Sequence, residues 1–529
     1  MILRLLMTKC FHHRVLSCGS KVHIQVKYYC QNEKSLQDLC KYLNISESQA
    51  RFLQIKNRCV KKLNGDEIKN LVKTVNELGF PSDVVVNEPS ICSILPVTLK
   101  FRYRVLEECG VLNLSVKHLV SYMSLIKEKT IGELKTLGVI SPLVNIENKL
   151  ANCMTQWPTS LTTLVYGDVD KLTLYSLRLK IIQRYLELIL DITEIEFSRG
   201  LKIYPTLKHR PLAVINETLS ILQTKISMPT EKIKSNFYLI HADPDNMKHI
   251  LFKLRSIGGI DIKEVIRRYP KLAVKSYTSL LEIRNVLEEF GISNEAQTRC
   301  FQIYTLSPQT VKERLEKARS IPEFKTFLNH PRFLKMIHYN NTAMKRLRHL
   351  YDMNKKCLSL NVLSGSTAHY EIFEKAPGDR LGKGKDLVFC ISESLGNAYS
   401  MNDIRKRVKR HPFWINIPLV QVKYVYEKLS TEFSPKDIYE NCPILLYPWN
   451  KVKDVMNLVN KSCDSNQPLH LYEFLDLQKL SNTQKLSLIL YLLEKNHYFS
   501  GNGVWNDEKN KNIDTVSNIL VQNKNALIQ

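Results

Sequence analysis

The sequence lacks any apolar run of about 18 residues, the length that a membrane-spanning helix needs. Its longest apolar stretch, "LSLILYLL" at Leu486–Leu493, is far shorter, so we predict no membrane insertion. The 13 cysteines are scattered, odd in number and never spaced as Cys-x-x-Cys. Disulfide frameworks and zinc ribbons need regular spacing. We therefore interpret the cysteines as reduced thiols of an intracellular protein and predict no metal site.

Acidic residues are also in short supply. The 529 residues include 76 Lys and Arg but 51 Asp and Glu, which gives a formal net charge of +25. Such an excess favours an anionic partner, either nucleic acid or a membrane surface. The alternative is a basic protein whose charge serves solubility alone. With 44% hydrophobic and 24% charged residues, the chain is globular, and its length predicts several domains or a repeat array.

Residues 1–32 contain no acidic residue at all, since the first is Glu33. Apolar residues alternate there with cations, and Arg4 interrupts the apolar stretch that a secretory signal would need. This basic, acid-free, amphipathic pattern is typical of a mitochondrial transit peptide. We therefore expect import into the mitochondrial matrix. The cations are Arg4, Lys9, Arg14, Lys21 and Lys27.

Catalytic motifs are missing as well. "PGDRLGKGKD" at Pro377–Asp386 superficially resembles a phosphate-binding P-loop, but Asp379 stands where the first glycine belongs. Asp386 likewise replaces the Ser or Thr that would bind magnesium. We interpret the stretch as a flexible insertion. No nucleophile, base and oxyanion site can be assembled elsewhere, so we predict neither an enzyme nor a cofactor.

Proline follows a regular spacing along the chain. Gly110 and Gly291 each follow a proline by 21 residues, and Phe433 follows Pro412 by the same distance. Because proline ends helices and Ser, Thr and Asp begin them, we predict units of about 30–35 residues, each with two helices between prolines. The alternative is an irregular all-helical protein. Leucine stands 17 residues after Pro89, Pro205, Pro270 and Pro412, as Leu106, Leu222, Leu287 and Leu429.

Two stretches carry a family resemblance. "RRYPKLAVKSYTSLLEIRNVLEEFGIS" and "KRHPFWINIPLVQVKYVYEKLSTEFSPKDIYENCPILLYP" resemble the repeat of the mitochondrial transcription termination factor (mTERF) family, over roughly residues 78–460. The resemblance implies an all-α solenoid of helix-turn-helix repeats, crescent or half-doughnut shaped, with a basic concave path for nucleic acid. It also implies a role in mitochondrial transcription termination or regulation, or in mitochondrial ribosome biogenesis.

We expect six segments along the chain. The repeats are interrupted by a glycine-containing insertion or degenerate repeat, and an extension that fits no repeat follows them. The segments are the transit peptide (1–32), an N-terminal helical segment (33–77), repeats (78–360), the insertion (361–400), C-terminal repeats (401–460) and the extension (461–529).

Cations gather where one predicted repeat meets the next. Junctions recur on one edge of a solenoid, so these clusters can form a path for phosphates. The alternative is that cations near helix C-termini answer the helix dipole. The candidate nucleic-acid-binding residues are Arg267, Arg268, Lys271, Lys275, Arg314, Arg319, Lys345, Arg346, Arg348, Arg405, Lys406, Arg407, Lys409 and Arg410.

Taken together, these features predict a protein that binds mitochondrial double-stranded DNA and terminates or regulates transcription, with a possible protein partner in the transcription machinery. Two alternatives stay open at this point. One is an RNA-binding factor in mitochondrial ribosome assembly, whose partner is rRNA. The other is a helical scaffold that binds proteins.

Overall fold

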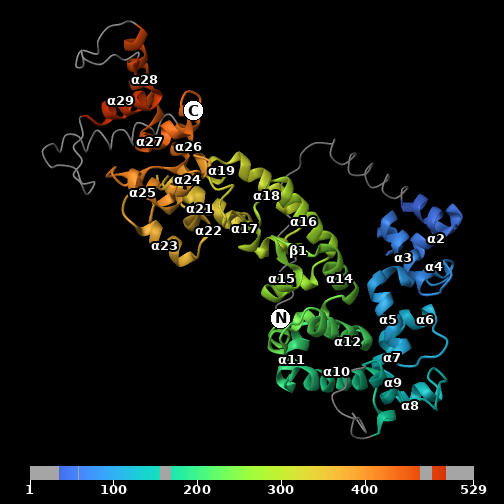
Figure 1. Ribbon diagram of the computed structural model, residues 1–529. Coiled ribbons are helices and arrows are strands. Elements are labelled where there is room, and N and C mark those ends of the chain that lie inside the picture. Colours follow the sequence, from blue (N-terminus) through green and yellow to red (C-terminus); the bar gives the residue numbers. More distant parts are fainter. Residues whose placement is uncertain (1–34, 58, 155–167, 465–478, 496–529) are drawn as a thin grey trace. The chain divides into compact units, whose positions relative to one another are not determined.

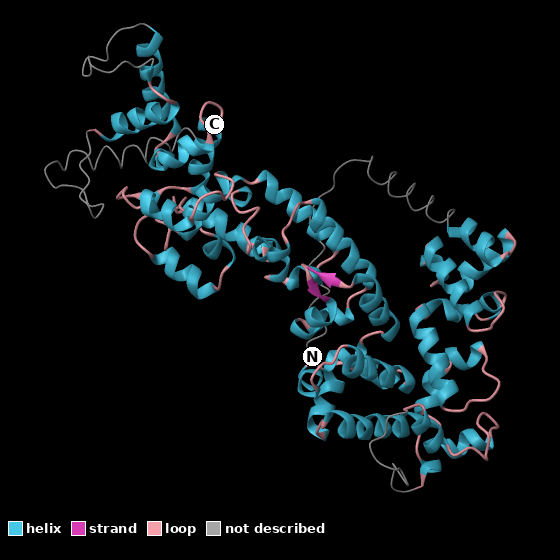
Figure 2. Cartoon of the chain, in the orientation of Figure 1, coloured by secondary structure: helices cyan, strands magenta, loops and turns pink. Residues whose placement is uncertain are grey.

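The computed structural model describes residues 35–57, 59–154, 168–464 and 479–495 (Figures 1 and 2). The predicted transit peptide lies outside these residues. Within them the chain is helical apart from its turns, one two-stranded sheet and isolated bridges, which confirms the all-α repeat fold. The chain divides into two compact units, Met1–Met247 and Lys248–Gln529.

The first unit is built of short helices and single helical turns. Residues 35–43 are helical. The helices that follow are α2 (Glu47–Lys56), α3 (Gly65–Glu77), α4 (Val84–Asn87), α5 (Pro96–Glu108), α6 (Val116–Val120), α7 (Tyr122–Lys127), α8 (Ile131–Thr136), α9 (Ile146–Asn152), α10 (Leu174–Leu190), α11 (Glu194–Ile203), α12 (Leu212–Ser220), α13 (Thr230–Ser235) and α14 (Pro244–His249). The turns are η1 (Val60–Lys62), η2 (Pro89–Ser93), η3 (Val169–Lys171), η4 (Pro205–His209), η5 (Ile221–Lys225) and η6 (Phe237–His241).

The second unit begins within α14 and holds the only sheet of the described residues, an antiparallel pair of β1 (Ser256–Ile257) and β2 (Ile260–Asp261). Its helices are α15 (Ile262–Arg268), α16 (Tyr277–Glu289), α17 (Asn294–Thr298), α18 (Pro308–Ser320), α19 (Pro322–Lys325), α20 (Phe333–His338), α21 (Asn340–Asp352), α22 (Leu360–Ser364), α23 (Thr367–Lys375), α24 (Lys385–Ser394), α25 (Met401–Val408), α26 (Leu419–Leu429), α27 (Pro435–Glu440), α28 (Trp449–Asp464) and α29 (Asn482–Glu494). The turns are η7 (Ile250–Leu254), η8 (Pro270–Val274), η9 (Phe301–Thr305), η10 (Trp414–Asn416) and η11 (Cys442–Leu446).

The repeat has three elements rather than the two that the sequence predicts. Pro270 opens a 3₁₀ turn, η8, and the long helix α16 begins only at Tyr277. A proline lacks the amide hydrogen but fits the first turn of a helix, where that hydrogen has no partner. The same seven-residue interval separates Pro89, Pro205 and Pro412 from the first residues of α5, α12 and α26, which are Pro96, Leu212 and Leu419.

The leucine that stands 17 residues after each of four prolines is part of the buried core. Leu106, Leu222, Leu287 and Leu429 are all completely buried. Each lies late in the helical stretch of its repeat, on the side that packs against neighbouring elements. Gly110 and Gly291 follow the long helices with φ of 76° and 69°, the left-handed conformation that ends helices and that glycine adopts without strain.

Part of the predicted C-terminal extension packs onto the last repeat. Helix α29 lies against α27 and α28. Asn441 Nδ2 donates to the carbonyl of Thr483 at 3.2 Å, and the hydroxyl of Tyr447 donates to Glu494 Oε1 at 3.0 Å. Leu486 and Ile489 are buried in this contact. Helix α29 therefore covers the apolar face of the last repeat.

Candidate nucleic-acid interface

Some of the candidate cations turn inward and tie neighbouring repeats together. Arg314 on α18 donates to the carbonyls of Ile337 and His338 at 3.0 and 2.7 Å, where α20 ends. Lys275 donates to the carbonyl of Thr305 at 2.6 Å, where η9 ends. The last carbonyls of a helix lack internal partners and carry partial negative charge. These two cations satisfy them, so their positions are explained by packing.

Arg346 is the clearest case of an inward-facing candidate. Its side chain is 8% exposed. Nη1 donates to the carbonyls of Val362 and Gly365 at 3.2 and 2.9 Å, and the guanidinium lies 4.6 Å from the Tyr370 ring centroid. Because it is buried and hydrogen-bonded, we exclude Arg346 from the candidate interface.

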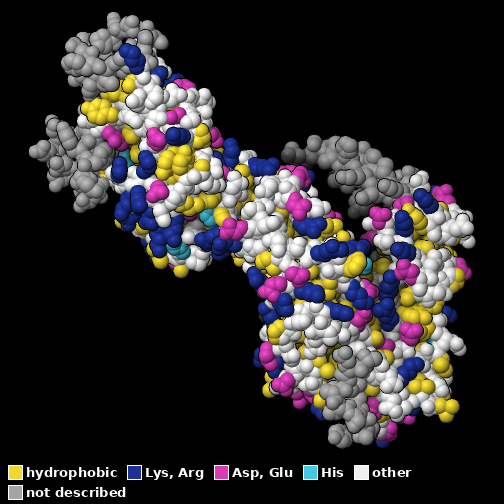
Figure 3. Space-filling model, viewed as in Figure 1, with side chains coloured by type: hydrophobic (Ala, Val, Ile, Leu, Met, Phe, Trp, Pro, Cys, Tyr) yellow, Lys and Arg dark blue, Asp and Glu magenta, His cyan; other side chains and the backbone are white. Residues whose placement is uncertain are grey.

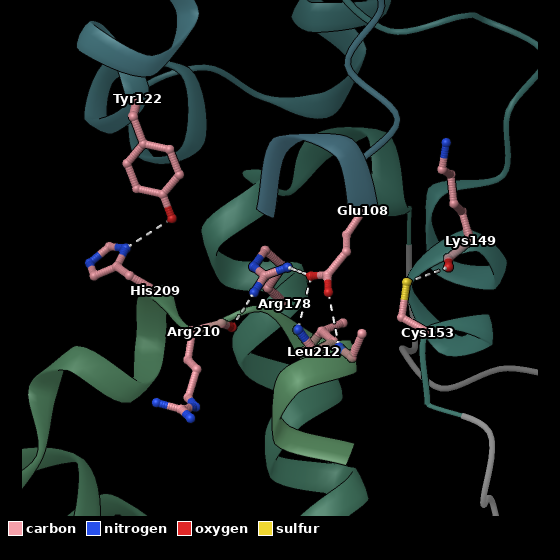
Figure 4. A network of polar contacts seen from close by, with 9 residues as sticks. Glu108, Tyr122, Lys149, Cys153, Arg178, His209, Arg210 and Leu212 are labelled. Carbon is pink, nitrogen blue, oxygen red and sulfur yellow. Dashed lines mark hydrogen bonds and ion pairs between the residues drawn. The ribbon is translucent and has the colours of Figure 1, made fainter. Parts of the chain in front are cut away.

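The first unit contains the same kind of tie, which the sequence analysis missed (Figure 4). Arg178, buried on α10, donates to the carbonyl of Arg210 at 2.7 Å and pairs with Glu108 Oε2 at 2.9 Å. Arg210 in turn donates to the carbonyl of His241 at 3.1 Å. The available signal was spacing, since Arg178 and Arg210 lie 32 residues apart, which is one repeat.

Glu108 completes this buried network. Its carboxylate accepts the amides of Leu212 and Ala213 at 2.9 and 3.0 Å and so caps the N-terminus of α12. Nearby, burial raises the pKa of the Cys109 thiol to about 11, so that thiol stays protonated. With the carboxylate committed to backbone and Arg178, the network is a structural tie and not a reactive centre.

The exposed cations of helix α25 and the segment after it form a compact group. Ile404 and Val408 are buried, one turn apart, and fix the inner face of the helix. Ser400 caps its N-terminus by accepting the amide of Asn402 at 3.3 Å. We define the α25 cluster as Arg405, Lys406, Lys409 and Arg410, all exposed.

Within the described residues, one member of the α25 cluster makes an ion pair: Lys406 Nζ lies 3.7 Å from Asp403 Oδ1.

Arg407 lies between the members of the cluster in the sequence but is only partly exposed. Its guanidinium lies 4.5 Å from the Tyr439 ring centroid, and Nη1 donates to the carbonyl of Glu440 at 2.9 Å. Tyr439 stacks on Tyr399 with a centroid distance of 3.6 Å. Arg407 therefore anchors α25 while its neighbours face solvent.

The arginines before Pro270 are partly neutralised. Arg267 and Arg268 each lie 2.9 Å from a carboxylate oxygen of Glu264. The hydrogen bond from Arg268 and the charge of Arg267 lower the pKa of Glu264. One carboxylate shared between two cations leaves the group with a net positive charge, and Lys271 beyond it is exposed.

The remaining candidates lie on helices α18 and α21. Arg319 is exposed, and its guanidinium lies 4.2 Å from the Phe290 ring centroid. Lys345 and Arg348 are exposed on α21. All the candidates belong to the second unit.

The structure also presents cations that sequence reasoning did not consider. Figure 3 shows Lys and Arg side chains gathered over the part of the second unit that carries α23 and α25 in Figure 1. Arg380 and Lys383 are exposed between α23 and α24, and Lys385 is exposed in the first turn of α24. In the sequence, these cations belong to the glycine-containing stretch Pro377–Asp386, which does not match the P-loop pattern. We call residues 376–386, which include the first two residues of α24, the glycine loop.

In the described part of the chain, no three His, Cys, Asp or Glu side chains gather as a metal site would require. No helix there is long and apolar enough to cross a membrane.

The fold and the repeat define an α-helical repeat protein. Comparison with known proteins then shows its family. The chain is 31% identical over 464 residues to "Transcription termination factor 5, mitochondrial" of Drosophila melanogaster, covering 87% of this chain and 81% of that protein. No family model and no solved structure matches.

The chain belongs to the mTERF family, which confirms the resemblance that the repeat indicates. It is a nucleic-acid-binding regulator of gene expression in the mitochondrial matrix.

Proposed function

We propose that the protein binds double-stranded mitochondrial DNA and terminates or otherwise regulates transcription. The name of the Drosophila relative supports transcription as the process. The observation that carries the proposal is the α25 cluster, in which Arg405, Lys409 and Arg410 are exposed and make no ion pair within the described residues. Like charges held this close repel one another, and a phosphate backbone relieves that repulsion.

The mechanism is electrostatic. Lys and Arg neutralise phosphates, release condensed counterions and fix the register of the protein on the duplex, and bound protein then obstructs the polymerase. If six or more phosphates are contacted, affinity falls about a thousandfold or more between roughly 50 and 200 mM salt. Fluorescence anisotropy with labelled mitochondrial duplexes measures this, and salt-independent binding would contradict the mechanism.

A variant tests the cluster itself. Arg405→Gln, Lys409→Gln and Arg410→Gln together remove three exposed cations and spare Arg407, whose contacts hold α25 in place. We expect weaker duplex binding and a shallower dependence on salt. The control variant changes the exposed Lys61, Lys62 and Lys69 of the first unit to Gln, which alters net charge equally. Equal losses in both variants would mean that net charge, and not this surface, governs binding.

The partner is identified by crosslinking in mitochondria, followed by sequencing of the bound nucleic acid. Reads from mitochondrial DNA that map near transcript ends support the proposal. Reads from rRNA without DNA occupancy would replace it with a role in ribosome assembly. If the Gln variant of the cluster restores function in cells that lack the protein as well as the wild type does, the protein acts as a scaffold.

A further inference from the structure

The glycine loop is held firmly although it has little regular structure. Asp379 accepts the amides of Lys356 and Cys357 at 2.7 and 2.9 Å. Lys355, which is 8% exposed, donates to the carbonyls of Glu374 and Ala376, both at 2.7 Å. The start of the loop is therefore fixed to the segment before α22, and its own aspartate is used for that attachment.

The far end of the loop is fixed in the same manner. Asp386, in the first turn of α24, accepts the amide of Leu360 at 2.7 Å. Leu381 is 2% exposed, and its amide donates to the carbonyl of Ile415 at 2.5 Å. Since both carboxylates bind backbone amides and Leu381 points inward, the exposed charge of the loop comes from Arg380, Lys383 and Lys385.

These contacts bring the loop to the segment that follows the α25 cluster. Asn416 Nδ2 donates to the carbonyl of Asp379 at 3.0 Å. A Cβ at Gly384 would lie 2.4 Å from the Trp414 ring, so the loop backbone rests against that indole. Trp414 is four residues after Arg410, and Gly384 stands between Lys383 and Lys385. The loop is thus held against residues 414–416, which follow the α25 cluster in the chain.

The loop also allows close approach. Gly382 is exposed, and a Cβ placed there would meet nothing within 4 Å. Gly382 directly precedes Lys383, and a residue without a side chain lets a phosphate reach the backbone without steric hindrance. The side chains of Arg380, Lys383 and Lys385 make no ion pair or hydrogen bond within the described residues.

We propose that the glycine loop and the α25 cluster together form one phosphate-binding site, in which Arg380, Lys383 and Lys385 hold the backbone of the bound DNA. The inference rests on the proposed function, DNA binding, and adds a second group of contacts that the repeat itself does not supply. The loop serves as a preformed support whose backbone needs little reordering on binding.

The test compares full-length variants by anisotropy on one duplex across a salt series. The loop variant is Arg380→Gln, Lys383→Gln and Lys385→Gln, and the α25 and first-unit Gln variants described above accompany it. Loss of two or three phosphate contacts lowers the slope of log affinity against log salt by about 0.9 per contact. At about 0.1 M salt we expect the loop variant to bind about tenfold or more weakly.

The outcomes separate the two proposals. A loss in the loop and α25 variants, but not in the first-unit variant, supports the inference. A loop variant that matches the wild type while the α25 variant loses affinity overturns the inference and leaves the proposed function standing. If wild-type protein shows no salt-dependent binding to the duplex, the proposed function fails first. Circular dichroism verifies folding, and the single variant Lys383→Gln replaces the triple one if the latter is destabilised.

Discussion

At the scale of single residues, the same residue type serves two purposes in this protein. Arg346 and Arg348 lie two positions apart on α21, one buried and one exposed. Each residue of a helix is rotated by about 100° from the one before it, so two side chains that are two residues apart point to nearly opposite faces. The sequence shows both arginines in one basic run. It does not tell which one donates hydrogen bonds to backbone carbonyls and which one is exposed to solvent. That distinction needs the packing of the neighbouring repeat.

The buried arginine of the first unit gives a stability prediction. Arg178→Met removes the cation while Glu108 stays buried and the carbonyl of Arg210 loses its donor. Removing one partner of a buried ion pair costs about 3–5 kcal/mol of stability. We therefore expect the free energy of unfolding, measured with urea, to fall by that amount. Adding Glu108→Gln removes the unpaired buried charge, so the double variant should recover part of the lost free energy of unfolding. A fully stable single variant would contradict the structural role of the tie.

The regular leucine gives a second prediction, with a built-in control. Leu287 is completely buried, so Leu287→Ala creates a cavity and should lower the free energy of unfolding by about 2–5 kcal/mol. Arg348 occupies the same place after Pro331 but is exposed. Arg348→Ala should change stability by less than about 0.5 kcal/mol. Equal costs at both positions would show that the leucine spacing has no packing role.

His209 adds a pH dependence. Burial first, and then the charge of Lys127, lowers its pKa to about 4, below the ordinary value near 6.5. The unfolded chain thus binds this proton more readily, so the stability is fully present above pH ~6.5 and declines as pH falls toward 4. His209→Gln removes this contribution. We expect the fall in free energy of unfolding from pH 7 to 5 to be smaller in the variant, and an identical fall would refute the assignment.

At the scale of elements, the proline and leucine spacing predicted the helical repeats and their length. It missed the 3₁₀ turn after the proline, because a five-residue turn such as "PKLAV" is too short to show a helical period. The failed P-loop pattern at Pro377–Asp386 led to a separate prediction, that of a flexible insertion. The attachments that hold it involve Lys355, Asp379 and Trp414, and such long-range pairings leave no local pattern.

Two glycines of that loop separate backbone strain from steric clash. Gly384 has φ of 61°, and a Cβ there would overlap the Trp414 ring. Gly378 has φ of 74° with nothing within 4 Å of a Cβ. Gly378→Ala should cost about 1–2 kcal/mol from the left-handed conformation alone. Gly384→Ala should cost more, and should speed amide hydrogen exchange across residues 376–386. Equal effects would mean that the indole contact does not hold the loop.

At the scale of the whole molecule, charge is the property that the sequence defined best. The excess of cations and the family both favour nucleic acid, and they follow from composition and repeat without any coordinates. What composition does not supply is the fraction of cations used internally. Lys275, Arg314, Arg346 and Arg407 all bind backbone carbonyls. The number of cations available to a nucleic acid is therefore smaller than the number of cations in the basic runs.

A formal net charge of +25 predicts opposite effects of salt on the free and the bound protein. Self-repulsion destabilises the compact free chain, and salt screens it, so the melting temperature of the free protein should rise between about 50 and 300 mM salt. Under the proposed function, duplex DNA stabilises the folded state by an amount that rises with the logarithm of its affinity, and salt reduces that affinity. Differential scanning fluorimetry should therefore show two melting curves that converge as salt increases. A duplex-induced rise in melting temperature that salt leaves unchanged would require contacts other than those to phosphate.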